Sequence, residues 1–219
     1  AGSIKNTYGT GCFLLMQTSS LRMTSSSGLL TTLACSTSDQ KSYALEGSIF
    51  IAGAAIQWLR DELQIIETAQ ETEQIANSIK DTGGVYVVPA FTGLGTPYWR
   101  PSARGAIVNL TRGTGRAEIV RATLESIAYQ TVDVVQTMAV EANLSFDCLK
   151  VDGGAVNNNF LMQFQADLLD RPVERPQQVE TTALGAAYLA GLTVGVWGDV
   201  AELEKYRKVD QVFTPSMST

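Results

Sequence analysis

Two glycine-containing segments of the sequence carry residue types that can hold a phosphate group. The first, TYGTGC at residues 7–12, places a threonine between two glycines. Glycines let backbone amides come close to an anion, and the hydroxyl of Thr10 adds another donor. A tight turn leading into a strand would use the same residues, because the G-x-G pattern is common. The segment therefore allows a phosphate contact at Thr10 without requiring one.

The second segment, VDGGAVNNN at residues 151–159, runs from an apolar strand through Gly153 and Gly154 into a helix that Asn158 can cap. The free N–H groups at such a helix start hold nucleotides at the carboxyl ends of strands in α/β folds. An ordinary strand-to-helix connection explains the segment equally well. The sequence contains neither the dinucleotide pattern G-x-G-x-x-G nor the phosphate loop G-x-x-x-x-G-K-[ST].

Gly53 and Gln57 lie four residues apart on a predicted helix and therefore share one face. A glycine within a helix costs about 1 kcal/mol relative to alanine. A flat ring lying against the backbone, with the glutamine amide beside it, would use this glycine. Close packing of the helix against a sheet requires it equally, and this pair alone favours packing.

Asp152 follows an apolar strand and is a candidate catalytic carboxylate. An aspartate in this position more often orders its own turn. No second carboxylate is fixed near it by the sequence, so an acid/base pair is not assigned. The chain has no histidine, which excludes a Ser-His-Asp relay and a histidine-ligated metal built from its own residues.

The charge and cysteine content narrow the class of protein. A net charge of −6 in 219 residues argues against a grip on the nucleic acid backbone. The three cysteines, Cys12, Cys35 and Cys148, are odd in number and far apart, which fits a reducing compartment. We predict that all three are buried as small apolar residues. The first residues lack the basic and apolar stretch of a leader peptide, so a cytoplasmic location is expected.

The elements that must position these residues follow from the hydrophobic pattern. Strands are predicted at 10–18, 29–35, 42–49, 85–91, 105–110, 148–151 and 172–175, and helices at 50–63, 68–80, 116–143, 158–169, 181–196 and 199–206. The 68–80 helix is polar and expected to be exposed. The uncharged 181–198 stretch is rich in glycine and favours a buried helix over a membrane span. Together these predict one α/β domain with a mixed sheet flanked by helices.

Six longer segments resemble the glycerol kinases of the FGGY carbohydrate kinase family. They are KNTYGTGCF (5–13), YALEG (43–47), VPAFTGLG (88–95), RATLESIAYQ (121–130), VDGGAV (151–156) and TALGAAY (182–188). Their order matches the carboxyl-terminal half of these enzymes over the whole chain. One departure is Asn109, where the family commonly has glycine; asparagine tolerates positive φ better than other residues.

The resemblance implies a ribonuclease H-like, actin-like ATPase fold for residues 1–219 and the transfer of a phosphoryl group from ATP, with Mg²⁺, to glycerol. By matching motif, Thr10 would contact the phosphates, and Gly53 and Gln57 would line the nucleotide site. Gly154 and Asn158 would meet the nucleotide where its phosphates join adenosine.

Matched in the same way, Phe13 would contact the carbon skeleton of glycerol. The expected partners are glycerol and ATP or ADP, with no nucleic acid and no membrane span.

The resemblance also implies that other parts of the enzyme lie outside this chain. The catalytic aspartate and the polar glycerol contacts would precede Ala1 in an amino-terminal half, and a basic, aromatic tail would follow Thr219. The full enzyme is expected to be a homo-oligomer, and this chain alone is expected to be inactive. Two alternatives stay open: a non-catalytic nucleotide-binding or interaction module, and a kinase for another polyol or a pentulose.

Overall fold

The computed structural model describes residues 1–35 and 41–217; residues 36–40, expected as a connection between strands, lie outside these ranges. The elements of the first half are β1 (Ile4–Tyr8), β2 (Cys12–Ser19), β3 (Leu30–Ala34), β4 (Ser42–Ile49), α1 (Gly53–Asp61), α2 (Glu71–Asn77), β5 (Tyr86–Val88) and β6 (Ala106–Val108). The elements of the second half are α3 (Arg116–Ala142), β7 (Leu149–Asp152), the 3₁₀ turn η1 (Gly154–Asn157), α4 (Asn159–Leu169), β8 (Val173–Pro176), α5 (Thr181–Thr193), α6 (Val200–Glu204) and β9 (Val209–Phe213).

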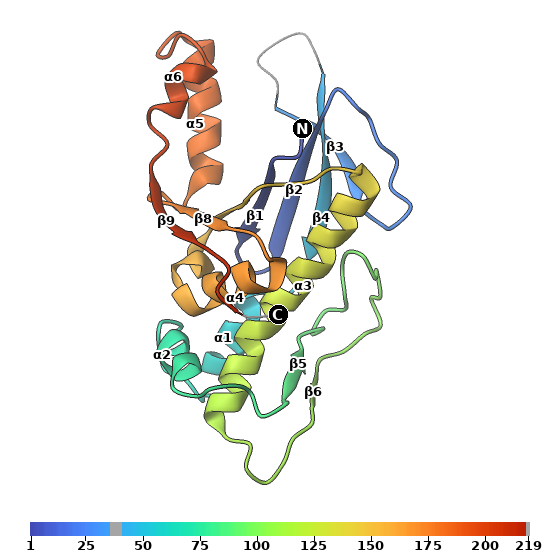
Figure 1. The fold of residues 1–219 in the computed structure, drawn as a ribbon, viewed down its shortest axis with the longest axis vertical. Coiled ribbons are helices and arrows are strands. Elements are labelled where there is room, and N and C mark those ends of the chain that lie inside the picture. The colour runs from blue at the N-terminus through green and yellow to red at the C-terminus, as the bar shows by residue number, and fades with distance from the viewer. Residues whose placement is uncertain (36–40, 218–219) are drawn as a thin grey trace.

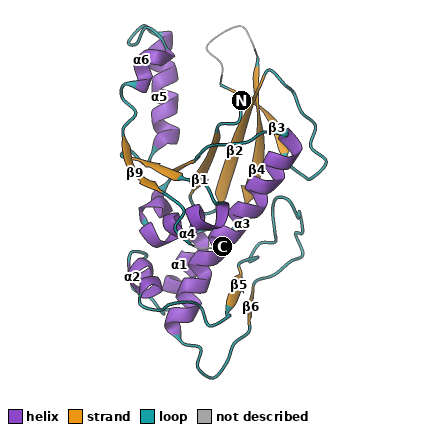
Figure 2. Cartoon of the chain, in the orientation of Figure 1, coloured by secondary structure: helices purple, strands orange, loops and turns teal. Residues whose placement is uncertain are grey.

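Seven strands form one mixed sheet in the order β3-β4-β2-β1-β7-β8-β9, and β5 pairs with β6 as a separate ribbon (Figure 2). The strand β1 is central, antiparallel to β2 and parallel to β7. The antiparallel strands β1 to β4 lie in the order β3-β4-β2-β1, so β3 forms the sheet edge and does not lie between β2 and β4. These strands and the strand and helix units that follow them confirm the predicted mixed sheet with helices.

The sheet register brings the candidate site segments to one edge. Thr7 is level with Asp152, so the turn after β1 and the glycine pair after β7 leave the sheet side by side. Cys12 is level with Ile49, so the chain that leaves β4 enters α1 at the same place. Segments separated by more than a hundred residues therefore meet because β1 lies between β2 and β7.

The long helix α3 packs along one face of the sheet (Figure 1). Its buried side chains include the predicted stripe Val120, Leu124, Ile127, Thr131, Val134 and Met138. In β2 the residues alternate, with Cys12, Leu14 and Met16 buried on the α3 side. The helix ends at Asn143, which takes the left-handed conformation at φ 49°. The predicted helix 116–143 is thus confirmed to within one residue.

Two strands are not among those predicted from the sequence. The strand β1 (Ile4–Tyr8) occupies the centre of the sheet, although its residues show only the glycine-turn motif. The strand β9 (Val209–Phe213) forms the sheet edge in the segment after the predicted 199–206 helix, where no element was predicted. In β1 the buried position between Ile4 and Tyr8 is the polar Asn6, and in β9 only Phe213 is buried, so neither sequence alternates apolar and polar residues as a half-buried strand does.

The prediction that the 181–196 helix is buried is wrong. Within α5 only Gly191 is buried, and most of the helix is exposed, standing apart from the other helices except α6 (Figure 1). The helix is apolar on all sides, so its sequence has no stripe that tells which face is covered. No helix within 1–35 and 41–217 combines the length and apolar character needed to cross a membrane.

The cysteine prediction is correct only in part. Cys12 is buried, Cys148 is half-buried and Cys35 is exposed, and all three are free thiols. Cys35 follows the end of β3, whose residues are exposed or only half-buried, so this position has no core to enter. Burial raises the pKa of the Cys12 thiol to about 12, which keeps it protonated and unreactive.

Candidate functional site

A pocket of about 340 Å³ opens where the turn after β1, the helices α1 and α2, and the η1 turn meet. This volume lies within the range of about 300–1,000 Å³ that is usual for small-molecule sites. Its floor is apolar and formed by Ile56, Leu124, Ile127 and Leu161. Its polar lining includes Thr10, Gln57, Arg60, Gln70, Thr72, Glu73, Asn157 and Asn158. The pocket can therefore take a ligand with a flat apolar part and a polar part.

The turn between β1 and β2 is tied directly to the start of α1. The carbonyl oxygen of Gly9 accepts from the backbone N–H of Gly53 at 3.0 Å, and that of Thr10 accepts from Ala52 at 2.9 Å and Ala54 at 3.0 Å. These bonds fix the turn against the helix and leave both Thr10 and Gly53 on the pocket wall. The TYGTGC segment is thus a tight hairpin turn that also lines a pocket.

Gly53 is required by packing. A Cβ atom at this position would lie 2.6 Å from the carbonyl oxygen of Gly9, which is closer than real Cβ contacts. Gly53 is thus needed for close packing, as expected, but the helix packs here against the turn after β1 and not against a sheet strand. The same face of α1 also lines the pocket, with Gln57 one turn and Arg60 two turns beyond Gly53.

Glycine is found at positions 153 and 154, after β7, for two different structural reasons. Gly153 has φ +91°, which L side chains rarely adopt, and a Cβ atom there would lie 2.4 Å from the carbonyl oxygen of Tyr8. A side chain is therefore excluded both by the backbone conformation and by the close contact. Gly154 has no heavy atom within 4 Å of an added Cβ and faces the pocket. Gly153 therefore shapes the turn, while Gly154 leaves room for a ligand.

Asn158 caps α4, as the sequence predicts. Its side-chain oxygen accepts from the backbone N–H of Leu161 at 2.9 Å. Its side-chain nitrogen donates to the hydroxyl of Thr72 at 3.0 Å, which joins α4 to α2 across the pocket wall. The amide of Asn158 is thus oriented from both ends, and its position beside the pocket is fixed.

Residues of α2 contribute to the pocket, and the sequence analysis missed them. Thr72 is 1% exposed and Ala76 is fully buried, so the expectation of an exposed 68–80 helix is wrong for this face. The small and apolar residues Thr72, Ile75, Ala76 and Ile79 recur at the three- and four-residue spacing of a buried stripe. That spacing is the signal that could have placed α2 against the body of the protein.

Arg60 lines the pocket and is ion-paired with its neighbour Asp61. Both nitrogens Nε and Nη2 of Arg60 donate to the carboxylate of Asp61, at 2.6 and 3.0 Å, on the exposed end of α1. This pairing lowers the pKa of Asp61 and raises that of Arg60. Arg60 therefore lines the pocket as one half of an ion pair, in which the charge of Asp61 offsets its own.

Phe13 does not line the pocket. It is 55% exposed and belongs to the residues of β2 that point away from the buried face. Of the six residues that the resemblance singled out, five therefore meet at one pocket, and Phe13 lies on the opposite face of the sheet.

Asp152 also lies outside the pocket lining. Its carboxylate is 1% exposed, with Oδ2 2.7 Å from the Nζ atom of Lys5. The hydroxyl of Thr181 donates to the same oxygen. The carboxylate therefore connects β7 to β1 and to the first residue of α5, which agrees with an ordering role rather than with an acid/base pair.

The departure at Asn109 keeps the backbone of the turn. Asn109 has φ 61°, the left-handed conformation in which glycine is favoured and asparagine is tolerated. Its side chain donates to the carbonyl oxygen of Gly84 at 3.0 Å. The substitution is therefore compatible with the fold.

Comparison with known proteins gives a consistent result. The sequence model of the C-terminal domain of the FGGY family of carbohydrate kinases matches residues 4–194. The glycerol kinase of Alkaliphilus metalliredigens is 61% identical over 216 residues, which are 99% of this chain and 43% of that protein. The glycerol kinase of Haemophilus influenzae is 60% identical over 215 residues, 98% of this chain and 43% of that protein. The chain thus spans less than half the length of these relatives.

Solved structures agree. The crystal structure of Plasmodium falciparum glycerol kinase with ADP superposes with a TM-score of 0.91 at 39% identity, covering 99% of this chain and 44% of that one. The xylulose kinase of Lactobacillus acidophilus superposes with a TM-score of 0.85 at 23% identity, covering 98% of this chain and 43% of that one. These neighbours confirm the predicted actin-like ATPase fold.

Proposed function

Because the chain belongs to the FGGY family of carbohydrate kinases, we propose that it is the carboxyl-terminal, nucleotide-binding part of a glycerol kinase. Residues 1–219 form one domain in this proposal. The complete enzyme transfers the γ-phosphoryl group of ATP to glycerol and releases ADP and glycerol 3-phosphate. This chain binds the nucleotide, and the rest of the enzyme supplies the base that accepts the proton of the attacking hydroxyl.

The observation that carries the proposal is the gathering of five residues at one pocket. Thr10, Gly53, Gln57, Gly154 and Asn158 come from three separate parts of the sequence and line the same cavity. The same five positions are those that the sequence motifs of the family assign to the nucleotide. The ADP complex of the Plasmodium falciparum relative gives further support, since that protein has the same fold over 99% of this chain.

The pocket geometry divides the nucleotide between two regions. The apolar floor of Ile56, Leu124 and Leu161 receives the adenine ring, and the open backbone at Gly154 lets the ring or ribose approach closely. The turn at Thr10 receives the phosphates, where backbone amides and the hydroxyl donate hydrogen bonds. Phosphoryl transfer depends on such positioning and on charge stabilisation more than on covalent chemistry by the protein.

Glycerol binds on the other side of the turn. Phe13 starts the exposed face of β2 one residue after the hairpin, so it lies next to the phosphate turn but outside the nucleotide pocket. Its ring contacts the carbon skeleton of glycerol, and the remaining part of the enzyme closes over this face. Closure excludes water and limits hydrolysis of ATP.

Magnesium accompanies the nucleotide in the complete reaction. Among the described residues, no group of three Asp, Glu, Cys or His side chains could hold a metal ion. The described residues of this chain therefore do not form a metal cage. Mg²⁺ commonly binds through substrate phosphates with one or two carboxylates, and we propose that any such carboxylate lies in the rest of the enzyme.

The location and assembly of the enzyme follow from the same proposal. A kinase that uses ATP and has three free cysteines fits the cytoplasm, where thiols stay reduced. The homo-oligomer expected for the complete enzyme rests on the family resemblance and stays a prediction.

A chimera tests the proposed reaction. Residues 1–219 replace the matching 43% of the Haemophilus influenzae glycerol kinase, which is 60% identical over this part. We expect glycerol-dependent ADP release from the chimera, and ADP binding without turnover from the chain alone. A folded chimera that binds ADP but turns over no substrate would support a non-catalytic module. Faster turnover of xylulose or gluconate than of glycerol would show that glycerol is not the preferred substrate.

A further inference from the structure

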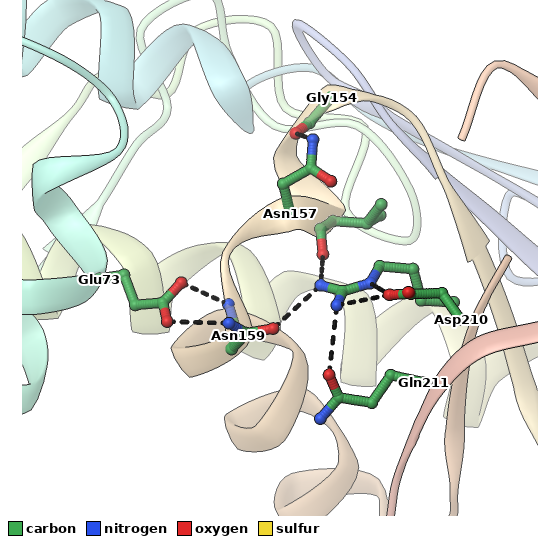
Figure 3. Close-up of polar contacts among 8 residues, drawn as sticks. Glu73, Gly154, Asn157, Asn159, Asp210 and Gln211 are labelled. Carbon is green, nitrogen blue, oxygen red and sulfur yellow. Dashed lines mark hydrogen bonds and ion pairs between the residues drawn. The ribbon is translucent and has the colours of Figure 1, made fainter. Parts of the chain in front are cut away.

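A buried arginine beside the pocket makes four hydrogen bonds and an ion pair. Arg175, on β8, is 9% exposed. Its Nη1 donates to the carbonyl oxygen of Val156 at 2.8 Å and to the side-chain oxygen of Asn159 at 3.0 Å. Its Nε and Nη2 lie 2.8 and 2.7 Å from the carboxylate of Asp210, and Nη2 also donates to Gln211 at 3.2 Å (Figure 3). All three guanidinium nitrogens therefore have partners, and these contacts hold the side chain in one orientation.

The contacts of Arg175 join two sides of the structure. Asp210 and Gln211 belong to the edge strand β9, and the ring of Phe213 lies 5.3 Å from the guanidinium carbon. Val156 and Asn159 belong to the η1 turn and the start of α4. The edge strand therefore anchors the arginine, and the arginine in turn anchors the turn that lines the pocket.

Asn159 carries this anchorage onward to α2. Because Arg175 binds its side-chain oxygen, the amide nitrogen of Asn159 faces Glu73, where it donates to Oε1 at 3.0 Å (Figure 3). The backbone N–H of Asn159 donates to Oε2 of the same carboxylate at 2.7 Å. The negative charge of Glu73 thus sits at the positive end of α4, which stabilises it.

Glu73 is itself part of the pocket wall. It lines the cavity together with Thr72, which Asn158 holds by the neighbouring hydrogen bond. Two adjacent asparagines at the start of α4 therefore hold two adjacent residues of α2, and this brace sets the width of the pocket between α2 and η1. Arg175 decides the orientation of one of these asparagines without lining the pocket.

We propose that Arg175 is a positioning residue for the nucleotide, acting through Asn159 on Glu73. The inference rests on the proposed function, because it takes the pocket to be the nucleotide site. Lysine at this position would keep the charge opposite Asp210 but offers a compact ammonium in place of the fork that reaches Val156 and Asn159 together. The replacement would therefore release the turn while leaving the ion pair.

The test measures ADP binding by titration calorimetry and unfolding by urea in the wild-type chain and its variants. We expect Arg175→Lys and Glu73→Gln each to raise the dissociation constant of ADP about tenfold. Because both act on one brace, the double variant should bind like either single variant. A purely structural arginine would lower the unfolding free energy but would show no coupling to Glu73 in ADP binding.

Two further variants complete the design. Asn159→Ala removes the side chain that connects Arg175 to Glu73 and leaves Arg175 itself in place. It should therefore weaken ADP binding, and it tests the proposal independently if Arg175→Lys does not fold. Arg207→Lys is the matched control, because Arg207 pairs with Glu174 on the exposed surface away from the pocket and should leave ADP binding unchanged.

The outcomes separate the two proposals. A folded wild-type chain that does not bind ADP would overturn the proposed function, and this inference with it. A wild-type chain that binds ADP while Arg175→Lys and Asn159→Ala bind it equally well would overturn the positioning role alone. The positioning role would also be contradicted if the dissociation constant of the double variant rose by the product of the two single effects.

Discussion

The backbone nitrogen of Gly53 lies 3.0 Å from the carbonyl oxygen of Gly9, and no side chain fits between them. This contact joins the first turn of α1 to the hairpin turn after β1. It fixes two walls of the pocket to each other, since Thr10 and Gln57 project from these same two segments. The geometry of the candidate phosphate turn therefore depends on a glycine more than forty residues away.

Replacing Gly53 tests this contact. Gly53→Ala places a Cβ atom 2.6 Å from a backbone oxygen, so we expect a loss of about 1–3 kcal/mol in the free energy of unfolding. Gly185→Ala is the control, because Gly185 lies in α5 with open space around it, and the change should stabilise the chain by up to about 1 kcal/mol. Urea unfolding of both variants measures the difference. Equal stability of Gly53→Ala and wild type would contradict the packing role.

The neighbouring glycines after β7 should respond in opposite ways. Gly153→Ala forces a positive φ on alanine and a contact of 2.4 Å with Tyr8, so the unfolding free energy should fall by at least about 2 kcal/mol. Gly154→Ala meets no atom and should change it by less than about 0.5 kcal/mol. Chemical denaturation compares the two. A smaller loss at Gly153 than at Gly154 would show that the turn is wrongly described.

Glu141 should make the stability depend on pH in the acid range. Burial raises its pKa, but hydrogen bonds from the Ser25–Ser27 segment outweigh this and lower the pKa from 4.5 to about 2. A carboxyl whose folded pKa is depressed stabilises the fold above its unfolded pKa, and that contribution is lost as the pH falls toward the folded pKa.

The comparison uses Glu141→Gln. Its unfolding free energy should be lower than that of the wild type at about pH 6, and this difference should shrink as the pH falls to about 3. Denaturant unfolding across this range is the measurement. A difference that stays constant or grows on acidification would show that Glu141 does not accept the bonds described.

Phe13 should separate the two ligand sites. Because its side chain is 55% exposed outside the pocket, Phe13→Ala should change the unfolding free energy by less than about 1 kcal/mol. ADP binding by the chain should be unchanged, while the Michaelis constant for glycerol should rise in the chimera. Calorimetry and steady-state kinetics measure these effects. Weaker ADP binding would place Phe13 in the nucleotide site instead.

The long helix α3 and the cap at Asn158 could be predicted because both leave local signals. Apolar residues at alternating steps of four and three predict a helix lying on a core, and these positions are buried in α3. An asparagine before an apolar run marks a helix start. Such signals need no knowledge of the distant parts of the chain.

Other features depend on partners that are remote in sequence. The strand β1 is recognised by its pairing with β2 and β7, and Glu73 belongs to the pocket because α4 holds it. The helix α5 is apolar on every side, so no pattern could show that it stands exposed. The pocket as a whole could be anticipated only because the resemblance named one ligand for residues that local reasoning could not connect.

Titration of ADP into the chain tests the central claim most directly. Gly154→Trp fills the open space in front of Gly154, and Gly185→Trp places the same side chain in open space outside the pocket. We predict that the wild type and Gly185→Trp bind ADP with the same dissociation constant, and that Gly154→Trp loses binding while keeping its unfolding free energy. Equal binding by all three proteins, or no binding by a folded wild-type chain, would contradict the account.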